Sequence, residues 1–107
     1  MKILNNWILK INIMNKKETL IYPLIWHKVE YEINETFIDF KVFEIEELNE
    51  DSPALSVFSD NPVMKGFIKW DGCCEFDYST HYCGLHNAEN FLQLMKSIYN
   101  YAMEKFK

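Results

Sequence analysis

Arginine is absent from this chain, and all 11 of its basic residues are lysine. The arginine guanidinium is the planar fork that binds guanine edges and carboxylates through paired hydrogen bonds. The chain is also acidic, with a formal net charge of −5 at pH 7. Because duplex DNA and anionic membrane surfaces attract positively charged proteins, we expect neither of them as a partner.

Glycine and proline are scarce, with three of each among 107 residues. The sequence contains no glycine-rich loop that could cradle a phosphate group, no paired-carboxylate motif and no recognisable Ser-His-Asp arrangement. Hydrophobic residues make up 49% of the chain, which excludes the disordered class. Because a chain of this length can bury one hydrophobic core, we expect residues 1–107 to form a single domain.

Long apolar runs are missing as well. No run approaches the roughly 18 residues of a membrane span, and lysine and asparagine interrupt the N-terminal stretch before it reaches signal-peptide length. The three cysteines, Cys73, Cys74 and Cys83, are an odd number without a Cys-x-x-Cys pair. A disulfide from Cys83 to one of the other two stays open, but reduced thiols are favoured. We therefore expect a cytoplasmic protein.

Alternation of apolar and polar side chains predicts an antiparallel sheet. It is clearest in residues 24–33 and 37–45, and the short connection at 34–36 predicts a hairpin between them. Phe43 and Ile45 break the alternation of the second strand. This break indicates a bulge or a strand that is buried on both faces.

Weaker strand signals lie on either side of this hairpin. Residues 6–14 alternate, and residues 19–22 form another short candidate strand after a predicted turn at 15–17. Residues 46–62 carry five acidic side chains and no lysine, which is typical of an acidic surface loop or of a docking surface for a basic partner. Within this segment, residues 54–58 fit a short strand or half a turn of helix.

The strongest local signal is the dipeptide Asp71-Gly72 between the β-prone residues 64–70 and 73–78. This dipeptide predicts a β-hairpin with a type I′ turn, in which both central residues have a positive φ.

The C-terminal residues 88–106 carry apolar side chains at three- and four-residue spacing, which predicts an amphipathic helix. Asn87 is a candidate N-cap, and Glu89 and Lys105 have the charges that the helix dipole favours in the first and last turns. We therefore predict an α+β fold, an antiparallel sheet of about five or six strands with one C-terminal amphipathic helix packed on one face.

Residues 70–87 hold all three cysteines and two of the three histidines. One interpretation of this segment is a zinc site with thiolate and imidazole ligands. The candidate ligands are Cys73 or Cys74, His81, Cys83 and His86. Two adjacent cysteines do not form the usual zinc knuckle, and only one of them would face the metal from a strand.

A catalytic thiol is the second interpretation. Cys83 lies four residues before Asn87, and a helix N-terminus lowers the pKa of a thiol. No oxyanion-hole signature or third positioned group accompanies it.

The third interpretation is structural, with the cysteines packed as small hydrophobic residues. We favour the structural interpretation and expect no metal, no cofactor and no catalytic residue. His27 lies on the apolar face of its strand, and we interpret it as a core histidine rather than a ligand.

Function is predicted mainly by exclusion. A small acidic domain that is rich in aromatic residues and lacks catalytic motifs is best explained as a non-catalytic binding module. The leading hypothesis is a partner-protein binder or inhibitor of the immunity or anti-defence type, with the acidic segment 46–62 and spare aromatic side chains in the contact. One helix leaves the second face of a sheet open, and exposed aromatic residues there would mark a homo-oligomer or a partner surface.

The candidate ligand- or partner-binding residues lie around the start of the predicted helix. They are Trp70, Asp71, Tyr78, His81, Tyr82, His86 and Asn87. The alternative hypothesis is an oligomeric protein that binds a small ligand or sequesters a nucleotide in a pocket lined by Trp70, Tyr78, Tyr82 and the N-terminus of the predicted helix. A third hypothesis is a zinc-binding or cysteine-dependent enzyme.

Overall fold

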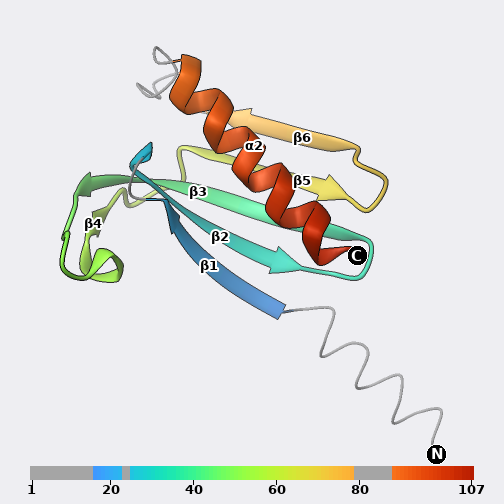
Figure 1. The fold of residues 1–107 in the computed structure, drawn as a ribbon, viewed down its shortest axis with the longest axis horizontal. Coiled ribbons are helices and arrows are strands. Elements are labelled where there is room, and N and C mark those ends of the chain that lie inside the picture. Colours follow the sequence, from blue (N-terminus) through green and yellow to red (C-terminus); the bar gives the residue numbers. More distant parts are fainter. Residues whose placement is uncertain (1–15, 23–24, 79–87) are drawn as a thin grey trace, which may run out of the picture.

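A computed structural model describes residues 16–22, 25–78 and 88–107 of the chain. A six-stranded antiparallel sheet carries the C-terminal helix obliquely across one of its faces (Figure 1). This arrangement confirms the predicted α+β fold. Along the chain, the elements are β1 (Lys16–Tyr22), β2 (His27–Ile33), β3 (Phe37–Glu47), the short 3₁₀ helix η2 (Pro53–Leu55), β4 (Val57–Phe58), β5 (Met64–Lys69), β6 (Cys74–Tyr78) and α2 (Ala88–Lys105).

The strands are ordered β1-β2-β3-β5-β6, and β4 pairs with the far end of β3. The long strand β3 therefore pairs with β5 and β4 in succession. Ser59 bridges the gap between these two short strands: its amide donates to the Glu44 carbonyl at 2.9 Å and its hydroxyl accepts from the Glu44 amide at 3.1 Å. The same hydroxyl donates to the Asn61 carbonyl at 3.0 Å. One serine thus replaces part of the interrupted ladder.

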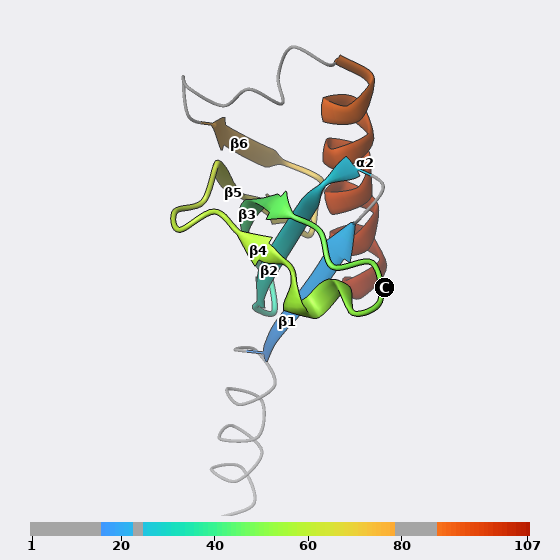
Figure 2. The ribbon, with the colours of Figure 1, turned by 90° about the vertical axis from the view of Figure 1, so that its left-hand side faces the viewer.

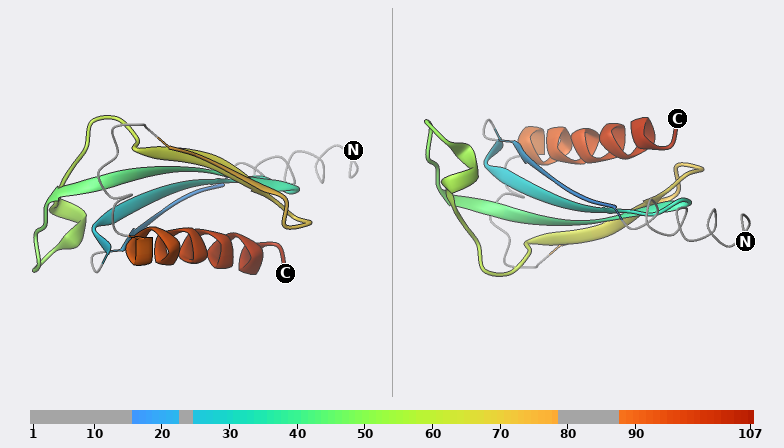
Figure 3. Two further views of the ribbon diagram at one scale, coloured as in Figure 1. Left: turned by 90° about the horizontal axis from the view of Figure 1, so that it is seen from above. Right: turned by 90° about the horizontal axis from the view of Figure 1, so that it is seen from below.

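The sheet and α2 form two layers, as both views of Figure 3 show, and the hydrophobic core lies between them. Alternate residues of each strand point toward the helix because side chains in a strand alternate between the two faces. Tyr31 is buried against the Tyr101 ring, with 4.3 Å between the ring centroids, and its hydroxyl lies 3.1 Å from that of Tyr22. The residues at most 2% exposed are Val29, Tyr31, Ile38, Phe40, Val42, Met64, Ile68, Leu94, Ile98 and Ala102.

Helix α2 is held at both edges of the sheet. Near its start, the Phe91 ring meets the Tyr78 ring of β6 edge-on at 5.9 Å. Near its end, Lys105 forms an ion pair with Glu18 of β1 at 3.1 Å. Glu89 and Lys105 lie in the first and last turns as predicted, whereas the proposed cap Asn87 lies outside the described residues.

The strand boundaries differ from the prediction at the N-terminal side. Lys16 and Lys17 lie in β1, where they pair with β2, so the predicted turn at 15–17 is wrong at these two positions. Pairing with a neighbouring strand outweighs the low β-propensity of lysine. Strand β2 begins at His27 rather than at residue 24, because the preceding Trp26 has a φ of +61° and turns the chain. The candidate strand at 6–14 lies outside the described residues.

Two ambiguous segments of the prediction now have a definite structure. The β3–β4 register shifts between Ile45 and Glu47, which confirms an irregularity where the alternation breaks, and Ile45 is only 3% exposed. Residues 54–58 divide between η2 and β4.

The β5–β6 hairpin is confirmed, but its predicted type I′ turn is wrong. Gly72 has a φ of +89°, and Asp71 does not have a positive φ. The Gly72 amide donates to the Lys69 carbonyl at 2.9 Å, and the Lys69 amide donates to the Cys73 carbonyl at 2.8 Å. These bonds define a three-residue loop that ends in a left-handed glycine. The Asp71 carboxylate accepts a hydrogen bond from the Cys73 amide at 3.0 Å, which stabilises this loop.

Gly66 allows β6 to approach β5 closely, which yields our first prediction. A Cβ at position 66 would collide with the Glu75 carbonyl oxygen and lie 2.8 Å from the Phe40 ring. We expect Gly66→Ala to lower the free energy of unfolding by about 1–3 kcal/mol, because the β6 backbone and the Phe40 ring must move. The exposed Lys69→Ala on the same strand should change it by less than about 0.5 kcal/mol in urea titrations. Equal effects of both variants would contradict the close approach.

His27 is buried, as the sequence predicted, and yields a second prediction. It is 5% exposed; burial lowers the pKa of its imidazole, and a backbone hydrogen bond with Ile25 partly opposes this shift. Its stabilising contribution is therefore present above the unfolded pKa of about 6.5 and is lost as pH falls through the lower folded value.

We expect the free energy of unfolding to decrease between about pH 7.5 and pH 5, and to decrease less in the variant His27→Gln. Urea titrations across this range measure the difference. His81 and His86 are retained in the variant and serve as the internal control. Parallel pH profiles for the two proteins would show that His27 does not titrate differently in the folded and unfolded states.

Candidate functional site

The residues predicted to form a binding site divide into two groups. Trp70 and Asp71 lie exposed in the β5–β6 turn, whereas Tyr78 lies at the opposite end of β6. The five residues of β6 span roughly 14 Å, so Tyr78 and the two turn residues do not lie side by side. The other predicted residues fall outside the described part of the chain. These are His81, Tyr82, His86 and Asn87.

The adjacent cysteines do not pack as the structural interpretation expected. Cys73 and Cys74 are both exposed, and neither is bonded to another described cysteine. They follow Gly72 at the outer strand of the sheet, beyond the area that α2 covers. Within residues 16–22, 25–78 and 88–107, no group of three His, Cys, Asp or Glu side chains could hold a metal ion. The remaining zinc candidates, including Cys83, lie outside these ranges.

The acidic segment 46–62 forms part of the fold rather than a simple loop. The Asn49 amide donates to the Ser56 hydroxyl at 2.8 Å, and the Ser52 amide donates to the Asn49 side chain at 3.0 Å. All five acidic side chains of the segment are exposed. Leu55 and Val57 are also exposed beside them, at 72% and 48%. The segment therefore presents carboxylates mixed with apolar side chains.

The face of the sheet opposite α2 carries a shallow hollow. The helix lies on only one side of the strands (Figure 2), and the other side forms a shallow depression of about 570 Å³. We call this surface the open face. Its lining contains six acidic residues and three lysines. The side chains that give it its chemistry are Lys17, Thr19, Glu30, Glu32, Asp39, Lys41, Lys65, Phe67, Glu75 and Asp77.

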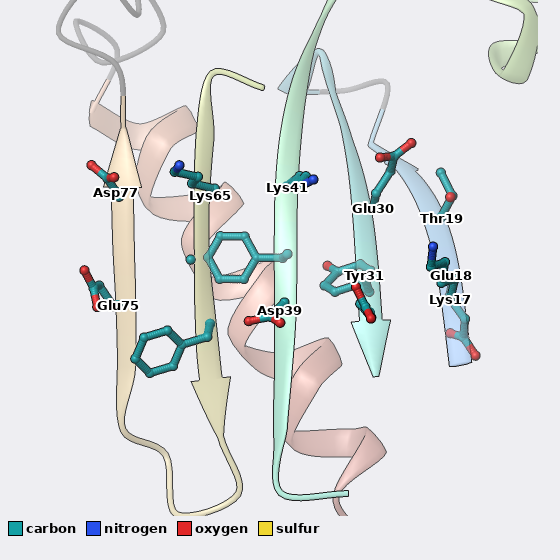
Figure 4. Close-up of a pocket in the computed structure, with 14 residues that line it drawn as sticks. Lys17, Glu18, Thr19, Glu30, Tyr31, Asp39, Lys41, Lys65, Glu75 and Asp77 are labelled. Carbon is teal, nitrogen blue, oxygen red and sulfur yellow. The ribbon is translucent and has the colours of Figure 1, made fainter. Parts of the chain in front are cut away.

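The strand register arranges these side chains in two rows across the sheet. The first row contains Lys17, Glu32, Asp39, Phe67 and Glu75, and the second contains Thr19, Glu30, Lys41, Lys65 and Asp77. Figure 4 shows Asp77, Lys65, Lys41 and Glu30 side by side in the second row. Each row crosses all five strands of the main sheet, so the open face is a continuous polar surface.

Like charges are direct neighbours at the centre of the open face. Glu32 is opposite Asp39, and Lys41 is opposite Lys65. Like charges directly opposite each other destabilise a sheet. None of these four side chains forms an ion pair within 4 Å of another described residue, although Lys28 and Glu30 pair at 3.7 Å beside them. The centre of this surface therefore holds charges that the described fold does not neutralise.

The environment of Asp39 shows the effect of this arrangement. Desolvation at the sheet surface raises the pKa of the Asp39 carboxyl, the charge of Glu32 raises it further, and Lys41 opposes the rise. A positively charged group placed between Glu32 and Asp39 would stabilise both carboxylates. The first row thus offers a site for a cation, and the Lys41–Lys65 pair offers a site for an anion.

The sequence predicted an open second face of the sheet and named exposed aromatic residues as the mark of a partner surface there, but it did not identify the charged residues of this face as a candidate site. The signal was present, because Lys28, Glu30 and Glu32 alternate with the buried side chains of β2. Alternation alone does not show which charges of different strands become neighbours.

Comparisons of the chain with known protein families, with curated proteins and with solved structures gave no match. Among the described residues, no helix has the length and apolar character that crossing a bilayer requires.

Removal of a like-charge neighbour gives the third prediction. We expect Asp39→Thr to raise the free energy of unfolding by about 0.2–1 kcal/mol at pH 7, because it removes the repulsion from Glu32 and introduces a residue with higher β-propensity. The pKa of the Asp39 carboxyl group is raised in the folded protein. This group therefore contributes favourably to the free energy of unfolding below its unfolded pKa, and the contribution is lost as pH rises through the folded pKa.

The increase in the free energy of unfolding caused by Asp39→Thr should therefore become smaller as pH falls toward 4. Urea titrations at several pH values would measure this change. Glu75→Thr is the matched control, since Glu75 is opposite Phe67 rather than a carboxylate. A loss of stability in Asp39→Thr at pH 7 would show that the Glu32–Asp39 pair does not destabilise the sheet.

Proposed function

We propose that this protein is a small non-catalytic binding module that docks another protein against the open face of its sheet, as a binder or inhibitor of the immunity or anti-defence type. The supporting observation is the pattern of charges at the centre of that face. Glu32 and Asp39, and likewise Lys41 and Lys65, are like-charged neighbours without ion pairs among the described residues. Charges that cost stability in the free protein can be neutralised by complementary groups on a partner.

The chemistry of the open face favours a protein partner over a small ligand. A volume of about 570 Å³ falls within the range of ligand pockets, which are mainly apolar and enclose most of the ligand. Here the depression is a shallow sheet surface with six acidic residues and three lysines. A non-obligate protein interface is about as apolar as the rest of a protein surface and has a polar rim, so a shallow surface that mixes charged side chains with Phe67 fits a protein contact better than an enclosed pocket does. The nucleotide-sequestering alternative has less support from this surface.

The charges of the open face also indicate the chemistry of the contact surface that a partner would need. Basic groups would lie opposite Glu32 and Asp39, and an acidic group would lie opposite Lys41 and Lys65. The excess of acidic residues in the lining favours a partner whose contact surface is basic overall. A partner of this kind would associate faster at low salt, since screening weakens steering between exposed charges.

The fourth prediction tests this proposal with a charge-reversed open face. We expect Lys41→Glu with Lys65→Glu to weaken partner binding by roughly tenfold or more, because the anion-binding part of the face becomes repulsive. The matched control is Lys96→Glu with Lys107→Glu, which makes the same charge change at exposed positions on and after α2. The control should retain binding within about threefold.

The measurement is copurification from the native host, followed by titration of the recovered protein in purified form. A partner that binds both double variants equally well would contradict docking on the open face. The wild-type protein and the two double variants must have similar free energies of unfolding in urea, so that a loss of binding cannot be the result of a loss of folding. A thermal-shift screen with nucleotides tests the alternative; a shift of more than about 2 °C that survives both double variants would favour a ligand site elsewhere.

A further inference from the structure

We infer that the outer edge of β6 is a second docking surface, which accepts an extended segment of a partner protein as an additional strand with alternating apolar and basic residues. This inference rests on the proposed function, because an added strand would continue the open face beyond β6. Addition of a strand to an exposed sheet edge is a general mode of peptide recognition, in which backbone hydrogen bonds give affinity and alternate side chains give specificity.

The outer edge of β6 has no described neighbour. Strand β6 pairs with β5 along one edge, and no other described strand pairs with its opposite edge. Proteins commonly protect such an edge with charged side chains, especially lysine, with proline or with a bulge. Strand β6 contains no lysine, proline or bulge, and its only charges are two exposed carboxylates, Glu75 and Asp77, which repel another acidic edge but attract a basic one.

One face of β6 is apolar, and it lies on the side of the sheet that carries α2. Cys74, Phe76 and Tyr78 lie on the face that carries α2, and the Phe91 ring of the helix contacts the Tyr78 ring. At the other end of β6, the Tyr99 hydroxyl lies so close to the hairpin that a Cβ on Gly72 would be 3.0 Å away. Side chains of the helix thus reach β6 at Tyr78 and the preceding hairpin at Gly72.

The flank of α2 next to β6 is exposed and apolar. Leu92 is 53% exposed and Tyr99 is 36% exposed. These two residues are seven positions apart, so they lie on the same side of the helix at a separation of roughly 10 Å. The apolar side chains of a strand added to β6 would be placed against this flank and against the exposed side of Tyr78.

The other face of β6 is acidic. Glu75 and Asp77 line the open face and form no ion pair with a described residue. Residues directly opposite in an antiparallel pair have Cβ atoms about 4.5–5.5 Å apart, so alternate residues of an added strand would lie next to these carboxylates. Lysine or arginine is the complementary choice at those positions.

A second copy of this chain does not fit the same edge. In an antiparallel pair of two β6 strands, residues on the acidic face meet only residues of that same face. When the two strands are aligned, Glu75 lies opposite Asp77, Glu75 lies opposite Glu75, or Asp77 lies opposite Asp77 of the other copy. Each of these contacts is repulsive at neutral pH. The two carboxylates therefore discourage self-association and select a basic strand.

The fifth prediction uses two synthetic octapeptides with blocked ends as probes. One alternates valine and lysine, and the other has the same composition arranged as four valines followed by four lysines. We expect the alternating peptide to bind at least about tenfold more tightly, because only it can present valines to α2 and lysines to Glu75 and Asp77 together. Fluorescence anisotropy measures both affinities, and hydrogen exchange should show slower exchange of the β6 amides with the alternating peptide.

Charge reversal at β6 tests the assignment of the edge. Glu75→Lys with Asp77→Lys should weaken the alternating peptide by about tenfold or more, whereas Glu50→Lys with Asp51→Lys, the same charge change in the exposed segment 46–62, should weaken it by less than about threefold. Equal affinity for the two peptides, equal effects of the two double variants, or no binding at about 1 mM would each overturn the inference.

Two further variants separate the possible explanations. Light scattering measures whether the double variant Glu75→Gln with Asp77→Asn forms dimers. If it does, and if the wild-type protein does not bind the alternating peptide, the carboxylates serve only to keep the edge unpaired. Lys41→Glu, which lies two strands away from β6, should retain the alternating peptide within about threefold. Peptide binding without partner capture would reject the open-face proposal alone, and partner capture without peptide binding would reject the β6 inference alone.

Discussion

The packing of one helix across one face of the sheet is the constraint on which the other features depend. Ile98 and Ala102 of α2 are completely buried against the sheet, and the helix is tied to β1 by the Lys105–Glu18 ion pair. A helix of 18 residues is about 27 Å long, and a single one can cover only one face of five strands. The strands must therefore place apolar side chains on one side only, and the other side remains open to solvent.

This division separates the surface that stabilises the fold from the surface that is available for recognition. In the second row of the open face, Glu30 lies opposite Lys41, and Lys65 lies opposite Asp77; both pairings are favourable. The central Lys41–Lys65 pair interrupts the alternation of charge. An exposed like-charge pair costs only a fraction of a kcal/mol to about 1 kcal/mol, which the buried face can offset. An arrangement that is suboptimal for the free protein is therefore compatible with folding, and binding can exploit it.

The sequence was sufficient to predict both hairpins and the helix, and part of β1, because alternation and helical spacing are local signals. It was sufficient to predict that one face of the sheet is open, but not the charge pattern of that face, since Lys41 and Lys65 become neighbours only when β5 pairs with β3 beyond the interruption at Ser59. The turn type was also missed, because the Asp71 side chain stabilises a three-residue loop that no dipeptide rule distinguishes. The positive φ of Trp26 has no comparable sequence signal, as bulky residues rarely adopt it.

The two edges of the sheet differ in how their charges are used. On β1, Glu18 forms ion pairs with Lys16 and Lys105 at 3.1 Å each, and these hydrogen-bonding partners hold the pKa of its carboxyl below the usual value despite the opposing effect of burial. On β6, Glu75 and Asp77 have no described ion-pair partner and belong to both the edge and the open face. A charge that is neutralised within the fold contributes to stability, whereas a charge without a partner is available to attract one. On the open face itself, β1 presents Lys17 and Thr19 whereas β6 presents two carboxylates, and this is why we place the added basic strand at β6.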